Sequence, residues 1–370
     1  MSSTPIKPQR LRQLLRRLLD IYSPSGKEEG VVDYLFTYLK RHGLPVVRQE
    51  VDENRENLIV SPAGSEAEAA YIGHMDTVTA YDLEDFGYEE EGGLIIGLGA
   101  ADMKGGCAAM IEAFICLQEE GFKDIPLALA LVVGEEEEGD GAAQLVKDFH
   151  FPWAVIGEPT GLSPCLSHYG YLETHLTTQG RKLHASLANR GRNAVEDMLR
   201  ILIRLTRYLE NQREEVVYNI RDLFSSGSGY VVPDGCEAYL DLHLPPSAPV
   251  AEITLEMENL LVQERRAYEE LEATLHFDTV EAGYILPEKG PLVEALKAVY
   301  QERALTWQPL AFPSHSDANQ LWSAGVKPII MGPGRLEQAH RPEESVSLAE
   351  VQTAAEIYYQ TARRLISGGS

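Results

Sequence analysis

Two hydrophobic patterns alternate through most of the chain. Residues 69–72, 127–133 and 153–156 are short, continuous apolar runs, which are typical of strands buried on both faces of a sheet. Apolar residues at helical spacing occupy 11–21 and 105–121. Buried strands that alternate with helices predict an α/β domain.

The pattern changes in the middle of the chain, where strand candidates alternate between apolar and polar residues. Five elements follow one another there as strand, helix, strand, helix and strand: 171–178, 193–209, 239–244, 253–270 and 273–280. Strands of this kind keep one face in solvent, so we expect a small α+β domain at 168–281. It is inserted into the larger α/β domain, which we place at 1–167 and 282–370.

Composition narrows the function. The 370 residues contain 57 acidic and 32 basic side chains, a formal net charge of -25, which disfavours binding to nucleic acid or to anionic membranes. The four cysteines are scattered, and the longest apolar run, 125–133, is too short to cross a bilayer. The first twenty residues lack the pattern of a signal peptide. We therefore expect a cytoplasmic protein with reduced thiols.

Five polar side chains stand in short motifs, most of them directly after apolar strands: His74, Asp102, Glu137, Glu158 and His340. Each alone has an ordinary explanation, such as a turn residue, a helix N-cap or a solvated charge run. Together they supply two imidazoles and three carboxylates, the donors that a pair of divalent ions such as zinc requires. The adjacent Glu136 remains as a general base, so the set predicts a two-metal hydrolase.

These motifs, in this order and spacing, resemble the M20 family of metallohydrolases, which includes acetylornithine deacetylases, succinyl-diaminopimelate desuccinylases, carboxypeptidases and aminotripeptidases. The resemblance runs nearly end to end. It is carried by residues 23–28, 73–78, 102–106, 136–137, 157–160 and 332–334 before His340. It implies a three-layer catalytic α/β domain with a mostly parallel sheet and an inserted ferredoxin-like α+β domain that serves as lid and dimerisation domain.

The resemblance also implies roles for individual residues. His74 and Glu158 hold one ion, Glu137 and His340 hold the other, Asp102 bridges them, and Asp76 orients His74. The ions are most often Zn²⁺, with Co²⁺ as an alternative.

The run of four glutamates is ambiguous by one position. The family has a glycine two positions after the liganding glutamate, and Gly139 therefore selects Glu137 as ligand and Glu136 as base.

In the inserted domain, the resemblance makes His184 a catalytic residue that reaches into the partner's site of a homodimer. Tyr230 and His243 stand where the family often has Asn and Arg that contact substrate oxygens. The loss of a bidentate guanidinium weakens the expectation of strict α-carboxylate recognition. Ser316 and Asp317 are pocket candidates, with a helix N-cap as the alternative.

The leading functional hypothesis is hydrolysis of the amide bond of a small N-acyl amino acid, as in acetylornithine deacetylases. An exopeptidase of the same family, acting as carboxypeptidase or as di- or tripeptidase, is the second. A metal-binding scaffold without turnover is the third, and the complete ligand set with an intact glutamate base argues against it.

Overall fold

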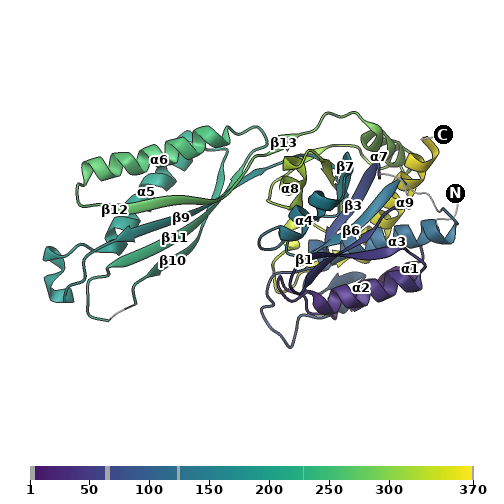
Figure 1. The fold of residues 1–370 in the computed structure, drawn as a ribbon, viewed down its shortest axis with the longest axis horizontal. Helices are drawn as coiled ribbons and strands as arrows, with labels where there is room; N and C mark the ends of the chain where they lie inside the picture. Colours follow the sequence, from purple (N-terminus) through teal and green to yellow (C-terminus); the bar gives the residue numbers. More distant parts are fainter. Residues whose placement is uncertain (1–4, 63–66, 123–125, 228, 369–370) are drawn as a thin grey trace. The chain divides into compact units, whose positions relative to one another are not determined.

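A computed structural model describes residues 5–62, 67–122, 126–227 and 229–368 of the protein (Figure 1). The chain divides into two compact units. The first comprises Met1–Ser167, Leu286–Phe312 and Ser316–Ser370, and the second comprises His168–Ile285 with the short segment Pro313–His315.

The first unit is built on a sheet whose central strands are parallel. Its order is β1-β2-β6-β3-β7-β15-β8, with β14 paired to β8. The strands are β1 (Val46–Asp52), β2 (Arg55–Val60), β3 (Ala69–His74), β6 (Leu127–Val132), β7 (Trp153–Ile156), β8 (Cys165–His168), β14 (Leu310–Phe312) and β15 (Lys327–Ile330). The four strands β6, β3, β7 and β15 are parallel, whereas β1, β2 and β8 join antiparallel to their neighbours. Every residue of β3, β6 and β7 is buried, which confirms the interpretation of these apolar runs.

Helices pack around this sheet in two groups. The helices are α1 (Pro8–Leu19), α2 (Glu29–Arg41), α3 (Gly105–Glu119), α4 (Asp140–Asp148), α7 (Pro291–Glu302), α8 (Asp317–Ser323) and α9 (Leu348–Gly368). Helices α1, α3, α7 and α9 pack against one another, α4 packs against α8, and α2 packs against β1 and β2 (Figure 1). A small sheet of β4 (Glu89–Glu91), β5 (Leu94–Ile96) and β16 (Ser345–Ser347) completes the unit. The α/β class is thus confirmed.

The second unit is an antiparallel sheet with two helices. Its elements follow in the order β9 (Gly170–Gln179), α5 (Ala194–Gln212), β10 (Val217–Ser225), β11 (Gly235–Leu244), α6 (Val250–Ala267) and β12 (Glu272–Glu281). The two-residue strand β13 (Tyr284–Ile285) ends its long segment. The sheet order is β10-β11-β9-β12, so the connectivity is β-α-β-β-α-β and the ferredoxin-like expectation is confirmed.

One strand of this unit escapes the sequence pattern. Along β9, buried and half-buried residues alternate, because one face packs on α5 and α6. Edge strand β10 is almost entirely exposed and has no such alternation, so the sequence predicts only three of the four strands. In the described part of the chain, no helix combines the length and the apolar character that a bilayer span needs.

Candidate metal centre

The carboxyl ends of three parallel strands bring polar side chains to one edge of the first unit's sheet. His74 ends β3, Glu135 and Glu136 follow β6, and Glu158 follows β7. Because β3 is the parallel neighbour of both β6 and β7, these ends meet at one edge. Asp102 joins them from η1 (Ala100–Lys104), the irregular segment before α3.

Asp102 lies between the two histidines. Its Oδ1 is 3.1 Å from Nε2 of His74, and its Oδ2 is 3.6 Å from Nε2 of His340. Oε2 of Glu136 is 2.9 Å from the same nitrogen of His340. Among the described residues, His74, Asp102 and Glu136 offer ligand atoms that all lie within 4.8 Å of one another. One carboxylate therefore faces two imidazoles, the arrangement that a bridging ligand needs.

Glu135 and Glu158 complete the cluster on the His74 side. Oε2 of Glu135 and Oε1 of Glu158 are 3.7 Å and 3.9 Å from Nε2 of His74. Oε1 of Glu158 is buried without a hydrogen-bond partner among the described residues. A buried carboxylate oxygen without a donor is costly unless a cation offsets it. This atom and the surrounding donor set fit a divalent ion.

The glutamate run turns sharply after its first two members. Gly134 has a left-handed φ of 78°, and its carbonyl accepts the N–H of Gly139 at 2.8 Å. A Cβ at Gly134 would lie 2.0 Å from Oδ1 of Asp140, so the turn needs glycine there. The turn leaves Glu137 and Glu138 exposed, while the side chains of Glu135 and Glu136 are only 10% and 5% accessible.

The sequence expectation for this run therefore does not match the geometry. It pairs Glu137 with His340, whereas the structure brings Glu136 to His340 and leaves Glu137 in solvent. The carboxylate beside the ligands is then Glu135. The spacing to Gly139 misleads because Gly139 closes the turn through Gly134 rather than following the ligand at a fixed interval.

Asp76 links the side chain of His74 to the backbone of Glu136, as a residue that orients a ligand should. Nδ1 of His74 is 3.1 Å from the backbone oxygen of Asp76 and 3.6 Å from its Oδ1. Its Oδ2 accepts hydrogen bonds from Oγ of Ser25 at 2.7 Å and from the N–H of Glu136 at 3.1 Å. These contacts hold the ring of His74 with Nε2 toward the cluster.

The electrostatics of the cluster also suit a cation. Burial raises the pKa of Glu135, Glu136 and Glu158, and neighbouring carboxylates add to the effect. Burial opposes the charge on His74, but the surrounding carboxylates, Glu135 first, outweigh it and raise its pKa well above the usual range. The hydrogen bond to Glu136 raises the pKa of His340 to about 9. A cluster of buried carboxylates therefore favours the binding of a cation at this site.

The other expected site residues are more scattered. Ser316 caps α8, its hydroxyl accepting the N–H of Ala318, so the N-cap alternative describes it. Asp317 is buried, and its charge helps to raise the pKa of Glu135 and Glu158. In the second unit, Tyr230 is 88% exposed and His243 lies on β11 with its ring 5.4 Å from that of Tyr171.

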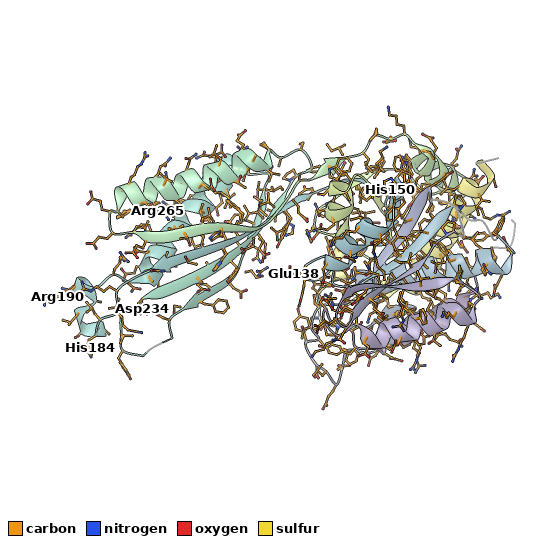
Figure 2. All side chains as sticks on the ribbon, viewed as in Figure 1. Glu138, His150, His184, Arg190, Asp234 and Arg265 are labelled. Carbon is orange, nitrogen blue, oxygen red and sulfur yellow. The ribbon has the colours of Figure 1, made fainter. Side chains whose placement is uncertain are left out.

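His184 also belongs to the second unit. It begins η2 (Ala185–Arg190), and its Nδ1 lies 2.8 Å from Oγ of Ser186. Its side chain is exposed, and Figure 2 labels it together with Arg190 on this short helix. Within the described residues of the second unit, the ring of His184 bonds to Ser186 and does not join a cluster of catalytic or metal-binding side chains.

The sequence pattern assigns no role to two buried residues around Asp102, namely Lys104 and Glu344. Nζ of Lys104 donates to the carbonyls of Leu18 and Ile21, both at 3.0 Å. The carboxylate of Glu344 accepts three backbone N–H groups of the segment that carries Asp102. Their position in or near the motifs is the only sequence signal for them, because charged residues beside a motif are usually exposed.

Comparison with known proteins places this centre in a family. The profile of Peptidase family M20/M25/M40 matches residues 70–364. The chain belongs to this family. A [LysW]-lysine hydrolase of Deinococcus radiodurans is 28% identical, with all of both chains covered. An acetylornithine deacetylase of Proteus mirabilis is 26% identical over 90% of this chain and 89% of its own.

Solved structures support the fold. An M20 family metallo-carboxypeptidase of Sulfolobus solfataricus matches with a TM-score of 0.76 and 15% identity, covering 96% of this chain and 99% of its own. The match to the family profile confirms the family resemblance read from the motifs, whereas a solved structure of 15% identity shows the shared fold alone.

Proposed function

We propose that this M20 protein is a metal-dependent amidohydrolase that removes the acyl group from a small N-acyl amino acid. The observation that carries the chemistry is the Asp102 carboxylate between His74 and His340, with Glu136 on the second histidine. The substrate class is supported by the full-length relatives, whose names describe them as a [LysW]-lysine hydrolase and an acetylornithine deacetylase.

Five side chains are the proposed ligands of two divalent ions. His74 and Glu158 would hold one ion, Glu136 and His340 would hold the other, and Asp102 would contribute to both. We propose Zn²⁺, with Co²⁺ as a substitute, because the donors are imidazoles and carboxylates. The similar structure from Sulfolobus solfataricus is described as a metallo-carboxypeptidase, which supports a metal site in this fold.

Glu135 is the proposed general base, one position before the residue that the sequence spacing selects. Its carboxylate lies beside His74 and Glu158, and its raised pKa suits a group that accepts and returns a proton. Divalent ions bound here would polarise the amide carbonyl and acidify the attacking water. Glu135 takes the proton from that water as it attacks and gives it to the leaving amine. Asp76 keeps the ring of His74 oriented throughout.

Three single substitutions test this assignment. Glu135→Gln should lower kcat by about 10²- to 10⁴-fold while two ions remain bound. Glu136→Gln should weaken ion binding, and the exposed Glu137→Gln should behave like the unaltered protein. The spacing-based assignment predicts instead that Glu136→Gln keeps its metal but loses kcat, and that Glu137→Gln loses metal. Metal content and kcat, measured on all three, decide between the two.

A substrate panel tests the acyl-amino-acid proposal. The metal-loaded enzyme is assayed with N-acetyl-ornithine, N-succinyl-diaminopimelate, an N-acyl-glutamate and simple dipeptides. Turnover of dipeptides without turnover of acyl-amino acids would favour the exopeptidase alternative, which the carboxypeptidase fold relative keeps open. Bound metal without turnover of any of them would favour the scaffold. A clear preference for acyl-glutamate would contradict our view of Tyr230 and His243 as weak carboxylate binders.

We also propose that the protein is a homodimer joined through the second unit. Edge strand β10 exposes Val217, Leu223 and Phe224 at 61%, 47% and 55%, and α5 exposes Leu199 and Ile203 at 45% and 50%. An open strand edge with exposed apolar side chains pairs readily with a second copy. His184 would then act in the partner's site. A fully active monomer in sedimentation at assay concentration would contradict both proposals.

The proposed location is the cytoplasm. The four cysteines are all buried, free thiols, as expected for a protein of a reducing compartment.

A further inference from the structure

Glu344 is a buried acid that binds the segment carrying Asp102. Its exposed fraction is 1%. Its Oε2 accepts the N–H of Gly99 at 2.9 Å, and its Oε1 accepts the N–H groups of Ala101 and Asp102 at 2.8 Å and 2.9 Å. The third of these donors belongs to the proposed bridging ligand itself.

The backbone of Glu344 is fixed as well. Its carbonyl accepts the N–H of Gly97 at 3.0 Å, and its own N–H donates to the backbone carbonyl of Arg341 at 3.1 Å. Glu344 follows His340 by four residues, in the same loop. The residue therefore ties the loop of one proposed ligand to the segment of another. Its neighbour Glu343 is exposed.

The irregular backbone around Asp102 explains why a side chain is needed here. Asp102 has φ −117° and ψ 99°, and Met103 has φ −125° and ψ 36°, so η1 does not follow helical geometry through these residues. A regular helix leaves its first N–H groups without partners, and an irregular start adds to that need. Buried N–H groups without acceptors are costly, and a carboxylate is the strongest acceptor the chain has.

We propose that Glu344 is a positioning residue for the metal centre: it fixes Asp102 relative to His340 and so sets the spacing of the two ion sites. Its carboxylate accepts three backbone N–H groups, so it would act on bound ions through Asp102. The proposal rests on the metal-dependent function above. Residues that orient metal ligands typically contribute 10- to 100-fold in metal affinity or activity.

The test is a titration of metal-free protein with Co²⁺, followed by calorimetry and by the visible absorption of the bound ion. Glu344→Gln keeps the size but turns one acceptor into a donor that faces a backbone N–H. We expect affinity for at least one ion to fall by about 10- to 100-fold and the absorption spectrum to change. Glu343→Gln, in the same loop but exposed, is the matched control and should titrate like the unaltered protein.

A second variant and a rescue experiment separate positioning from folding. Glu344→Asp keeps the charge but has a shorter reach, and it should show a smaller loss of affinity; it carries the test if Glu344→Gln does not fold. Excess Co²⁺ should restore most of the kcat of either folded variant, which a purely structural defect would not allow. Unchanged affinity and spectrum in a folded variant would overturn the proposal.

The titration uses no substrate, so it is independent of the deacylase assignment. If the unaltered protein bound no ion, the proposed function itself would fail. If it bound two ions and the Glu344 variants did the same with equal affinity, only the positioning role would fail.

Discussion

The two sheets of the protein differ in the partners that surround their buried acidic residues. In the first unit, parallel strands buried on both faces end at one edge, where Asp102, Glu135, Glu136 and Glu158 gather with little access to solvent. In the second unit, the antiparallel sheet keeps one face open, and Asp241 is balanced by a hydrogen bond from Arg221 at 3.0 Å. In the first unit these four carboxylates face two imidazoles, so negative charge remains for a cation to offset, whereas in the second unit a guanidinium neutralises the acid.

The comparison supports our proposal that the acids at the edge of the first sheet bind metal ions, whereas Asp241 of the second unit has a partner within the protein. The largest expected effect follows from this difference. Asp102→Asn should lower kcat by about 10³-fold or more, because several kcal/mol of transition-state stabilisation depend on the shared carboxylate and each 1.36 kcal/mol is tenfold in rate. Steady-state kinetics with measured metal content provide the check.

A buried acid of the second unit is the control for this substitution. Asp197 is buried on α5, with its Oδ1 3.0 Å from Nη1 of Arg200. Asp197→Asn should leave metal content and kcat within about threefold of the unaltered enzyme, since the distinction between units concerns ligands and not burial. Equal losses in both variants would break the comparison.

The next effect concerns the packing of the second unit. Leu205 is 2% exposed in the core between α5 and the sheet. Leu205→Ala should lower the free energy of unfolding of this unit by about 2–5 kcal/mol, because the lost methyl groups leave a cavity. Denaturant unfolding measures the loss, and Leu255→Ala, at a position 55% exposed on α6, should cost less than about 1 kcal/mol.

How far the sequence predicts each unit follows from the same contrast. The runs of β3, β6 and β7 are continuous and apolar because both faces are buried. The proposed ligands His74, Glu136 and Glu158 stand at or shortly after the ends of these strands, so the fold and the types of these side chains follow from the pattern. The edge strand β10 is exposed and carries no pattern. In the glutamate run, the register depends on the turn closed between Gly134 and Gly139, a tertiary feature that spacing alone does not specify.

The sequence pattern also does not predict which side chains bind distant backbone N–H groups. Glu343 and Glu344 are adjacent and chemically identical, yet one is exposed and the other accepts three N–H groups around Asp102. No local pattern distinguishes them, because the donors lie more than 240 residues away in the chain.

Metal addition should stabilise one unit only. At a free ion concentration of 100 times Kd, binding adds about 2.7 kcal/mol to the free energy of unfolding of the unit that holds the site. Differential scanning calorimetry of the metal-free and metal-loaded protein should therefore show the transition of the first unit moving upward. The same experiment on Asp102→Asn should show a smaller shift, and a shift confined to the second unit would contradict the placement of the site.

The smallest expected effect is a pH dependence that arises at His168, the first residue of the second unit. Its ring is buried, stacks on Tyr284 with ring centroids 5.5 Å apart, and approaches the carbonyl of Tyr169 through Nδ1. Burial lowers its pKa to about 3, against about 6.5 in the unfolded chain. Below pH 6.5 the unfolded state therefore binds a proton that the folded state does not bind. The free energy of unfolding decreases as the pH is lowered from about 6.5 to about 3. Between pH 7.5 and 5.5 this group alone should remove about 1.4 kcal/mol from the free energy of unfolding.

The variant His168→Phe tests this contribution, because it keeps an aromatic ring against Tyr284 but does not titrate. Its free energy of unfolding, measured in chelator to exclude metal effects, should decline less over this range by that amount. His150→Gln, at an exposed position, should decline as the unaltered protein does. If the His168→Phe curve also ran parallel to that of the unaltered protein, His168 would not be the neutral, buried group that the structure indicates.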